Sequence, residues 1–192
     1  VLKLKLGTDR DRELVDAVRE AAPDARLRVD ANEAWTPKEA VAKSAWLADR
    51  DVEFVEQPVS ADDPEGLRYV YERSELPIAA DESCVTAADV PAIADRCDIA
   101  NLKLMKAGSL SEARRVIAAA RAHGLEVMCG CMIESNASIA AAAQLAPLLD
   151  YADIDGSLLL DDDPYEGIDL PDGEIRLADQ DRAGTGARPA SE

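Results

Sequence analysis

Leu27-Arg-Val-Asp30 is a short, largely apolar run that ends in an acidic residue, and the same pattern returns in Val52-Glu-Phe-Val-Glu56 and Ile78-Ala-Ala-Asp81. Each run leads through a turn into a helical pattern, which is typical of a repeated strand–helix unit. In a parallel barrel the carboxyl ends of neighbouring strands converge on one face. We therefore expect the three carboxylates to meet there and to form a cage of oxygen ligands that suits Mg²⁺.

Strand-like apolar runs continue along the chain at a similar spacing and centre near residues 3, 28, 54, 79, 102, 128 and 153. The amphipathic patterns between them predict helices over residues 9–22, 36–49, 62–74, 87–96, 109–123 and 135–149. This alternation indicates an α/β fold with a parallel sheet. Because no glycine-rich phosphate turn follows any strand, the seven strands favour a (β/α)₈ TIM-type barrel over a doubly wound sheet.

The predicted barrel is one strand short. A closed barrel of this type has eight strands, and the chain begins with Val1 already in a strand pattern. We therefore expect a fragment of a longer protein, with one incomplete barrel domain over residues 1–178. Residues 179–192 are polar and rich in Gly and Arg, and they are predicted to form a disordered tail.

The composition narrows the classes of partner. Asp and Glu outnumber Lys and Arg by 39 to 21, which gives a formal net charge of −18. Such a surface repels nucleic acid and anionic membranes, so we expect neither as a partner. Acid excess with few lysines is typical of adaptation to concentrated salt, whose ions screen the self-repulsion. The sequence contains neither a signal peptide nor an apolar stretch of membrane-spanning length, so we expect a cytoplasmic protein.

Lysines lie at the corresponding ends of two further predicted strands, in Leu2-Lys-Leu-Lys-Leu-Gly7 and in Asn101-Leu-Lys-Leu-Met-Lys-Ala-Gly108. Together with Val29-Asp-Ala-Asn32, Val55-Glu-Gln-Pro58 and Ala80-Asp-Glu-Ser83, they resemble the strand-end motifs of the enolase superfamily, muconate-lactonizing-enzyme subgroup. Five motifs in the right order at barrel spacing make the resemblance specific, and it covers nearly the whole chain, from barrel strand 2 to strand 8. It implies that the first strand and an N-terminal capping domain are missing.

The resemblance also implies a proton transfer at a carbon next to a carboxylate. It implies that Asp30, Glu56 and Asp81 bind Mg²⁺, with Mn²⁺ as an alternative, and that this metal stabilises an enediolate. Lys5 and Lys103 are implied to be acid/base groups on opposite faces of the substrate, a role that a lysine can take when burial and neighbouring cations lower its pKa. The residues implied to support or orient these groups are Lys3, Asn32, Glu82 and Lys106.

Two opposed lysines imply inversion of the carbon by a 1,1-proton transfer, as in a racemase or epimerase. The single histidine, His123, lies beside a glycine that ends a helical pattern, so a histidine-based dehydratase is disfavoured. Tyr151-Ala-Asp-Ile-Asp-Gly156 resembles the Asp-x-Asp signature of dipeptide epimerases, in which Asp153 and Asp155 would hold the ammonium group of the substrate. Glu134 is expected to line the same site.

The resemblance thus implies a Mg²⁺-dependent dipeptide epimerase of the L-Ala-D/L-Glu type, acting on the C-terminal residue of a small dipeptide. Three sister activities stay open at this point: muconate cycloisomerase, o-succinylbenzoate synthase and N-acylamino-acid racemase. Their substrates lack a free α-ammonium group, so Asp153 and Asp155 are the discriminating residues. A catalytically inert fragment is the alternative from another class, and assembly into a homo-oligomer is left open.

Overall fold

The computed structural model describes residues 1–177 and 182–190. The chain divides into two compact units, and each is described by itself. The first unit contains residues 1–84, 89–100 and 123–125, and the second contains residues 85–88, 101–122 and the chain from residue 126 onward.

The first unit is built on parallel strands that follow one another in chain order: β1 (Leu2–Lys5), β2 (Leu27–Asp30), β3 (Val52–Glu56), β4 (Ile78–Ala80) and the first residues of β5 (Ile99–Lys103). The register places Lys5 beside Asp30, and Asp30 beside Glu56. Because these residues end their strands, their side chains start from one edge of the sheet. These strands were all predicted from their apolar runs.

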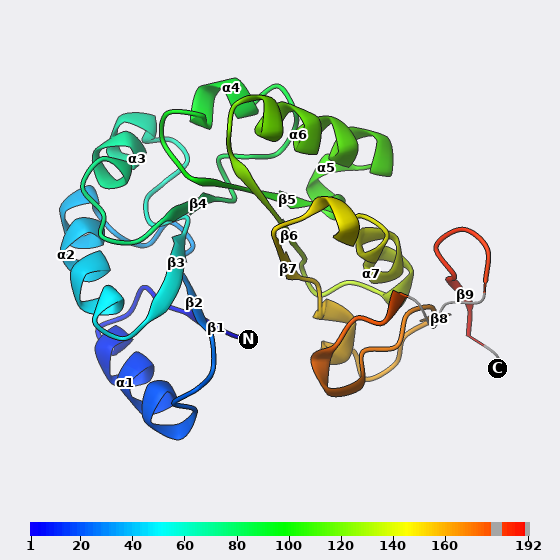
Figure 1. The fold of residues 1–192 in the computed structure, drawn as a ribbon. Helices are drawn as coiled ribbons and strands as arrows, with labels where there is room; N and C mark the ends of the chain where they lie inside the picture. The colour runs from blue at the N-terminus through cyan, green and yellow to red at the C-terminus, as the bar shows by residue number, and fades with distance from the viewer. Residues whose placement is uncertain (178–181, 191–192) are drawn as a thin grey trace. The chain divides into compact units, whose positions relative to one another are not determined.

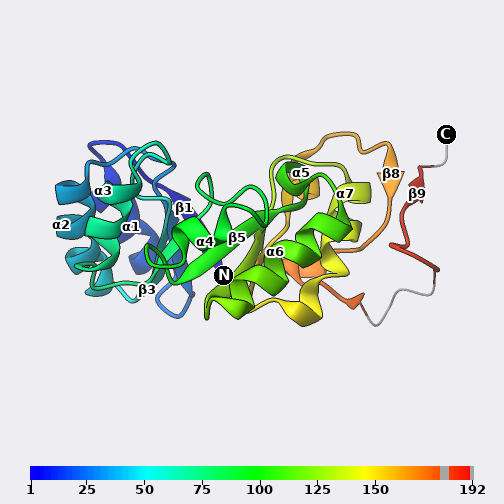
Figure 2. The ribbon, with the colours of Figure 1, turned by 90° about the horizontal axis from the view of Figure 1, so that it is seen from above.

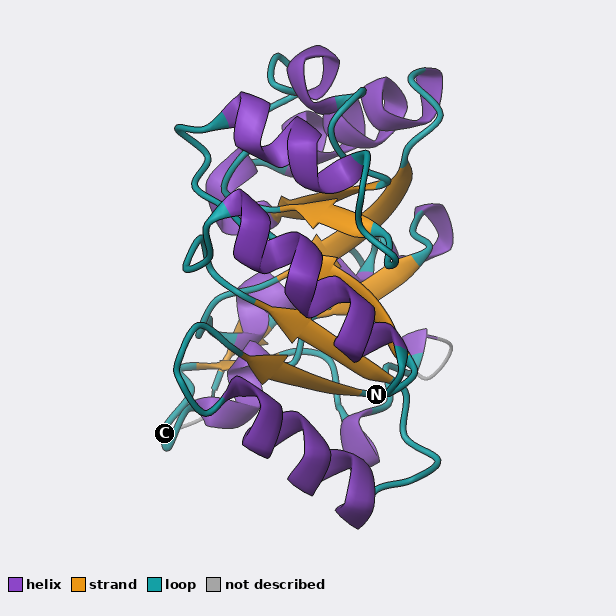
Figure 3. Ribbon diagram, turned by 90° about the vertical axis from the view of Figure 1, so that its left-hand side faces the viewer, coloured by secondary structure: helices purple, strands orange, loops and turns teal. Residues whose placement is uncertain are grey.

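Helices cover one face of these strands, as Figures 1 and 3 show. The helices are α1 (Asp11–Ala21), α2 (Pro37–Ala48), α3 (Pro64–Tyr71) and α4 (Val90–Ile93). The sequence explains where α2 begins: Thr36 and Glu39 form a reciprocal capping box, and Pro37 occupies the first turn. The helix predicted over residues 87–96 was too long: Pro91 has no amide hydrogen to donate to Ala87, so it lies in the first turn of a helix that begins at Val90 and ends at Ile93.

The second unit contains the end of β5, followed in order by the parallel strands β6 (Glu126–Gly130) and β7 (Tyr151–Asp153). Its helices are α5 (Leu104–Ala107), α6 (Leu110–Ala122) and α7 (Asn136–Ala143). The short α5 was not predicted; it ends at Gly108, whose φ of 76° is left-handed. The helix predicted to reach residue 149 ends at Ala143. Pro147 has no amide hydrogen to donate, so the helix could not have continued through this residue, which lies in the 3₁₀ turn that follows.

The C-terminal part of this unit is mostly irregular. Short 3₁₀ turns form η1 (Ala146–Leu148), η2 (Gly156–Leu159) and η3 (Pro171–Gly173). The strand β8 (Tyr165–Glu166) pairs antiparallel with β9 (Arg188–Pro189), and the two lie side by side in Figure 2. Of the tail predicted over residues 179–192, residues 179–181 and 191–192 lie outside the described part of the chain. Throughout residues 1–177 and 182–190, every helix is too short or too polar to cross a bilayer.

Candidate functional site

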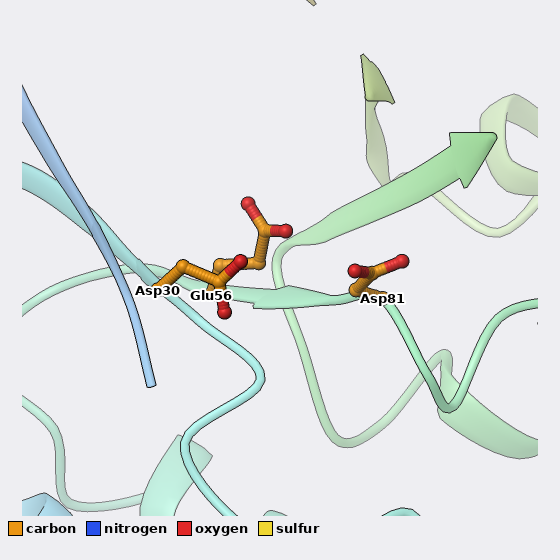
Figure 4. Close-up of side chains that lie close together, drawn as sticks. All are labelled: Asp30, Glu56 and Asp81. Carbon is orange, nitrogen blue, oxygen red and sulfur yellow. The ribbon is translucent and has the colours of Figure 1, made fainter. Parts of the chain in front are cut away.

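Three buried carboxylates meet at the carboxyl edge of the first unit's sheet. Asp30 and Glu56 end β2 and β3, and Asp81 follows β4 directly. One oxygen from each of them lies within 4.8 Å of the others, and all three residues are at most 1% exposed (Figure 4). Three hard oxygen donors at this spacing fit Mg²⁺ or a similar divalent cation. The structure thus brings together the three carboxylates that the sequence analysis singled out.

Two lysines from β1 provide positive charge beside this cluster. Lys3 Nζ lies 2.9 Å from Glu56 Oε2 and 3.3 Å from Asp30 Oδ2. Lys5 Nζ donates to Asp30 Oδ2 at 2.6 Å, while 60% of the Lys5 side chain stays exposed. Lys3 is therefore a partner of the carboxylates at the sheet edge, and Lys5 is an amine that touches one of them and still faces solvent.

The protonation of the cluster follows from burial and charge. Burial, together with the charges of Asp30 and Asp81, raises the pKa of Glu56 to about 8, although Lys3 opposes this shift. Burial also disfavours the charged form of Asp30, but the charge of Lys3 and the hydrogen bond from Lys5 outweigh it and hold the pKa of Asp30 below its usual value. The charge of Lys3 alone does not offset burial and repulsion at Glu56, and a divalent cation bound here would add positive charge that favours its ionised form.

We expect a pH dependence of stability in the metal-free protein. Glu56 keeps its proton in the folded state up to about pH 8, whereas its ordinary pKa is 4.5. The folded state therefore binds more protons in this window, and this group lowers the free energy of unfolding as the pH rises, by at most about 1.4 kcal/mol per pH unit. Urea unfolding in the presence of a chelator measures the slope. Glu56→Gln is the control and should flatten it; equal slopes would contradict the assignment.

Backbone strain is concentrated just beyond the cluster. Asn32 (φ 41°), Glu33 (φ 67°) and Gln57 (φ 33°) all have left-handed backbone without being glycine. Such strain persists only where the surroundings impose it, and it is common at functional sites. Here the loops that follow Asp30 and Glu56 are held by backbone hydrogen bonds, among them Glu33 N to Gln57 O at 2.9 Å.

Gln57 is a positioning residue that the sequence analysis missed. Its fully buried side chain accepts hydrogen bonds from the amides of Asp81 at 2.9 Å and Ser83 at 3.2 Å. Its amide group donates to Val59 O and to the Ser83 hydroxyl, both at 2.9 Å. Gln57 therefore ties the loop that carries Asp81 to the end of β3. Its place in the Glu-Gln-Pro motif was the available signal, but its contacts could not be read from the sequence.

Two further residues expected near the cluster contact each other. Asn32 Nδ2 donates to Glu82 Oε1 at 3.3 Å, and Asn32 N donates to Asp30 Oδ1 at 2.9 Å. Burial, reinforced by the charge of Asp81, raises the pKa of Glu82 above its usual value. Asn32 thus connects Asp30 to Glu82, as expected for residues that orient the carboxylates.

The remaining predicted site residues lie in the second unit. Lys103 ends β5, is 5% exposed, and places Nζ 3.7 Å from Met132 Sδ. Glu134 is buried and accepts from Met132 N at 2.8 Å and from the Ser138 hydroxyl. Lys106 lies half-buried on α5. Asp153 ends β7, and Asp155 lies beyond the strand, separated from Asp153 in the sequence by the buried Ile154.

The whole chain, residues 1–192, matches the family described as Enolase C-terminal domain-like, and the chain belongs to this family. It is 46% identical to an L-Ala-D/L-amino acid epimerase from Pedosphaera parvula, over 93% of this chain and 52% of that protein. It is 44% identical to a hydrophobic dipeptide epimerase from Roseobacter litoralis, over 93% of this chain and 54% of that protein.

Among solved structures, the chain resembles the dipeptide epimerase from Enterococcus faecalis V583 complexed with Mg and the dipeptide L-Leu-L-Tyr. The TM-score is 0.88 and the identity 39%, over 96% of this chain and 55% of that one. The predicted α/β fold, that of the barrel domain of the enolase superfamily, is thereby confirmed. The chain spans about half the length of the curated relatives that it matches.

Proposed function

We propose that this chain carries the proton-transfer and metal-binding residues of a dipeptide epimerase, an isomerase that inverts the α-carbon of the C-terminal residue of a dipeptide. The observation that carries the proposal is the buried trio of Asp30, Glu56 and Asp81, with Lys5 2.6 Å from Asp30. Family membership and the activities named for the relatives point to the same class of reaction.

Asp30, Glu56 and Asp81 are the residues proposed to hold Mg²⁺ or Mn²⁺. When bound, the metal would neutralise the negative charge that develops on the carboxylate of the substrate as the α-proton leaves. Support comes from the three buried oxygen donors and from the magnesium in the structure of the Enterococcus faecalis relative. Lys3, Asn32 and Glu82 are proposed to hold these carboxylates in place.

Lys5 and Lys103 are the proposed acid/base pair. One neutral lysine removes the α-proton, and the protonated form of the other returns a proton to the opposite face, so the carbon is inverted. Both residues end a strand of the sheet, and Asp30 holds the amine of Lys5. Lys106, on the helix that follows Lys103, is proposed to help orient the groups of the site.

Asp153, Asp155 and Glu134 are proposed to contact the substrate, with the aspartates binding the ammonium group of the dipeptide. An L-Ala-D/L-Glu preference is the finer form of this proposal. The sister activities that take substrates without a free ammonium group need no such pair. Adaptation of the protein to concentrated salt is also proposed, and the net charge of −18 supports it.

Asp153→Asn is expected to weaken dipeptide binding by about tenfold or more, because it removes the charged partner of the ammonium group. The Kd for the unmodified dipeptide and for its N-acetyl form would be measured by calorimetry in Mg²⁺, and only the former should change. Asp161→Asn, in an exposed acidic run of the same unit, is the control. Unchanged affinity in Asp153→Asn would favour a substrate without an ammonium group.

The decisive test of the proposed function is the exchange of α-protons with D₂O, followed by NMR. The chain would be incubated with Mg²⁺, concentrated KCl and a small panel that includes L-Ala-L-Glu and hydrophobic dipeptides. Both stereoisomers of the C-terminal residue are expected to exchange. Absence of exchange across the panel, in protein that still binds Mg²⁺, would refute the enzymatic proposal and favour the inert fragment.

A further inference from the structure

We infer that Gly130 is a positioning residue for Lys103: its missing side chain leaves the space that the stem of the lysine occupies. This inference rests on the proposed function, because it concerns the position of the amine of Lys103, one of the two proposed bases. Gly130 ends β6 and pairs with Asp153 of β7. It lies in the same compact unit as Lys103.

The evidence is the space around Gly130. A Cβ atom at this position would lie 3.1 Å from Cε of Lys103, 2.9 Å from Oδ1 of Asn101 and 3.1 Å from Nδ2 of Asn101. These separations are shorter than ordinary van der Waals contacts. Lys103 and Asn101 are both buried on β5, so neither side chain can simply turn into solvent. Even the methyl group of alanine would therefore displace Lys103, Asn101 or both.

The backbone does not require glycine here. Gly108 and Gly124 have left-handed φ angles of 76° and 77°, and nothing lies within 4 Å of a Cβ at either position. Gly130 lies in a regular strand with no positive φ, and a Cβ there meets the side chains of two strand residues. The reason for glycine at position 130 is thus the close approach of Lys103 and Asn101.

The far end of the lysine is also held. Its Nζ lies 3.7 Å from Met132 Sδ, and the amide of Met132 donates to Glu134 at 2.8 Å. The stem passes Gly130 and the tip rests against Met132, so displacement of Cε would shift the amine. Misplacement of a reacting group by about 1 Å can cost about a hundredfold in rate. Gly130 therefore acts on the reaction through Lys103.

An asymmetric effect distinguishes this role from a general structural one. Gly130→Ala is expected to slow α-proton exchange of one stereoisomer by at least about tenfold. That stereoisomer should be the one that Lys103→Ala also fails to exchange, while exchange through Lys5 is retained. Gly167→Ala is the control for a steric clash elsewhere in the same unit: its new methyl group meets Asn136 and Ala140 more closely than that of Gly130→Ala meets its neighbours, so any loss there should be equal for both stereoisomers. Equal losses for both stereoisomers, or no loss in Gly130→Ala, would overturn the inference.

Two measurements test the effect of Gly130 on the position of Lys103 without any turnover of substrate. The modification rate of Lys103 by an amine-reactive reagent, read by mass spectrometry against the other lysines, should rise in Gly130→Ala, because the displaced amine leaves its buried position. If the wild-type chain exchanges no α-protons, the proposed function fails, and this rate alone tests Gly130; an unchanged rate refutes the inference. If Gly130→Ala does not fold, the triple variant with Asn101→Ala and Lys103→Ala removes every side chain that the new methyl group meets, and it should regain a cooperative melting transition. Failure to regain it counts against the inference.

Discussion

Lys103→Ala is expected to lose epimerisation by about a thousandfold or more while still exchanging the α-proton of one stereoisomer with solvent. Inversion needs a base on one face of the carbon and an acid on the other, so the loss of either lysine stops it. The remaining lysine can still remove a proton from its own face and return it after exchange with water. Lys5→Ala should show the complementary pattern, with exchange confined to the other stereoisomer.

The measurement is NMR of each pure stereoisomer in D₂O, combined with a chiral assay of product. Lys38→Ala, an exposed position at the start of α2, is the control and should keep both activities. The two lysines differ in their surroundings: 60% of the Lys5 side chain is exposed, whereas Lys103 is 5% exposed as a residue. Full epimerisation by either alanine variant would refute the two-base scheme.

Asp81→Asn is expected to abolish the stabilisation of the protein by Mg²⁺. A cation that binds only the folded state raises the free energy of unfolding by about 2.7 kcal/mol at a hundredfold excess over its Kd. The substitution replaces one of three buried carboxylate ligands by a neutral amide, which is a weaker ligand and carries no negative charge. The charge of Asp81 also helps to raise the pKa of Glu56, so the metal-free variant should be more stable than the wild type near pH 8.

Thermal melts with and without Mg²⁺ test both parts of this expectation, and Mn²⁺ should behave like Mg²⁺. Asp62→Asn, an exposed residue before α3, is the matched control and should retain the full shift in Tm. A shift of equal size in Asp81→Asn would mean that the cation binds elsewhere. Because no substrate is involved, this result is independent of turnover.

The sequence predicted the repeating units well, because each strand is a short apolar run and each long helix has an amphipathic pattern. It failed where local chemistry ended a helix early. Pro91 lies in the first turn of α4 (Val90–Ile93) and opposes an earlier start, and Pro147 prevents α7 (Asn136–Ala143) from running through residue 147. The four-residue α5 was missed because so short a helix has no periodicity to detect.

The candidate metal cluster was predictable for a topological reason. In parallel strands the last residues of successive strands lie at one edge, and Asp30, Glu56 and Asp81 therefore come close to one another in the folded chain. Residue types at strand ends thus carry spatial information. Lys3 pairs with Glu56 as well as with Asp30, which is also the partner of Lys5. This pairing depends on the length and direction of the side chains, so it was visible only in the structure.

The sequence by itself determined the strand–helix repeat, the family and the choice of candidate site residues, because these depend on residue type and spacing along the chain. Only the tertiary structure decided how those side chains are held. Gln57 clamps the Asp81 loop, and Gly130 leaves room for Lys103. Both effects arise between strands that are more than 20 residues apart in the chain, where the distances that decide them exist only after folding.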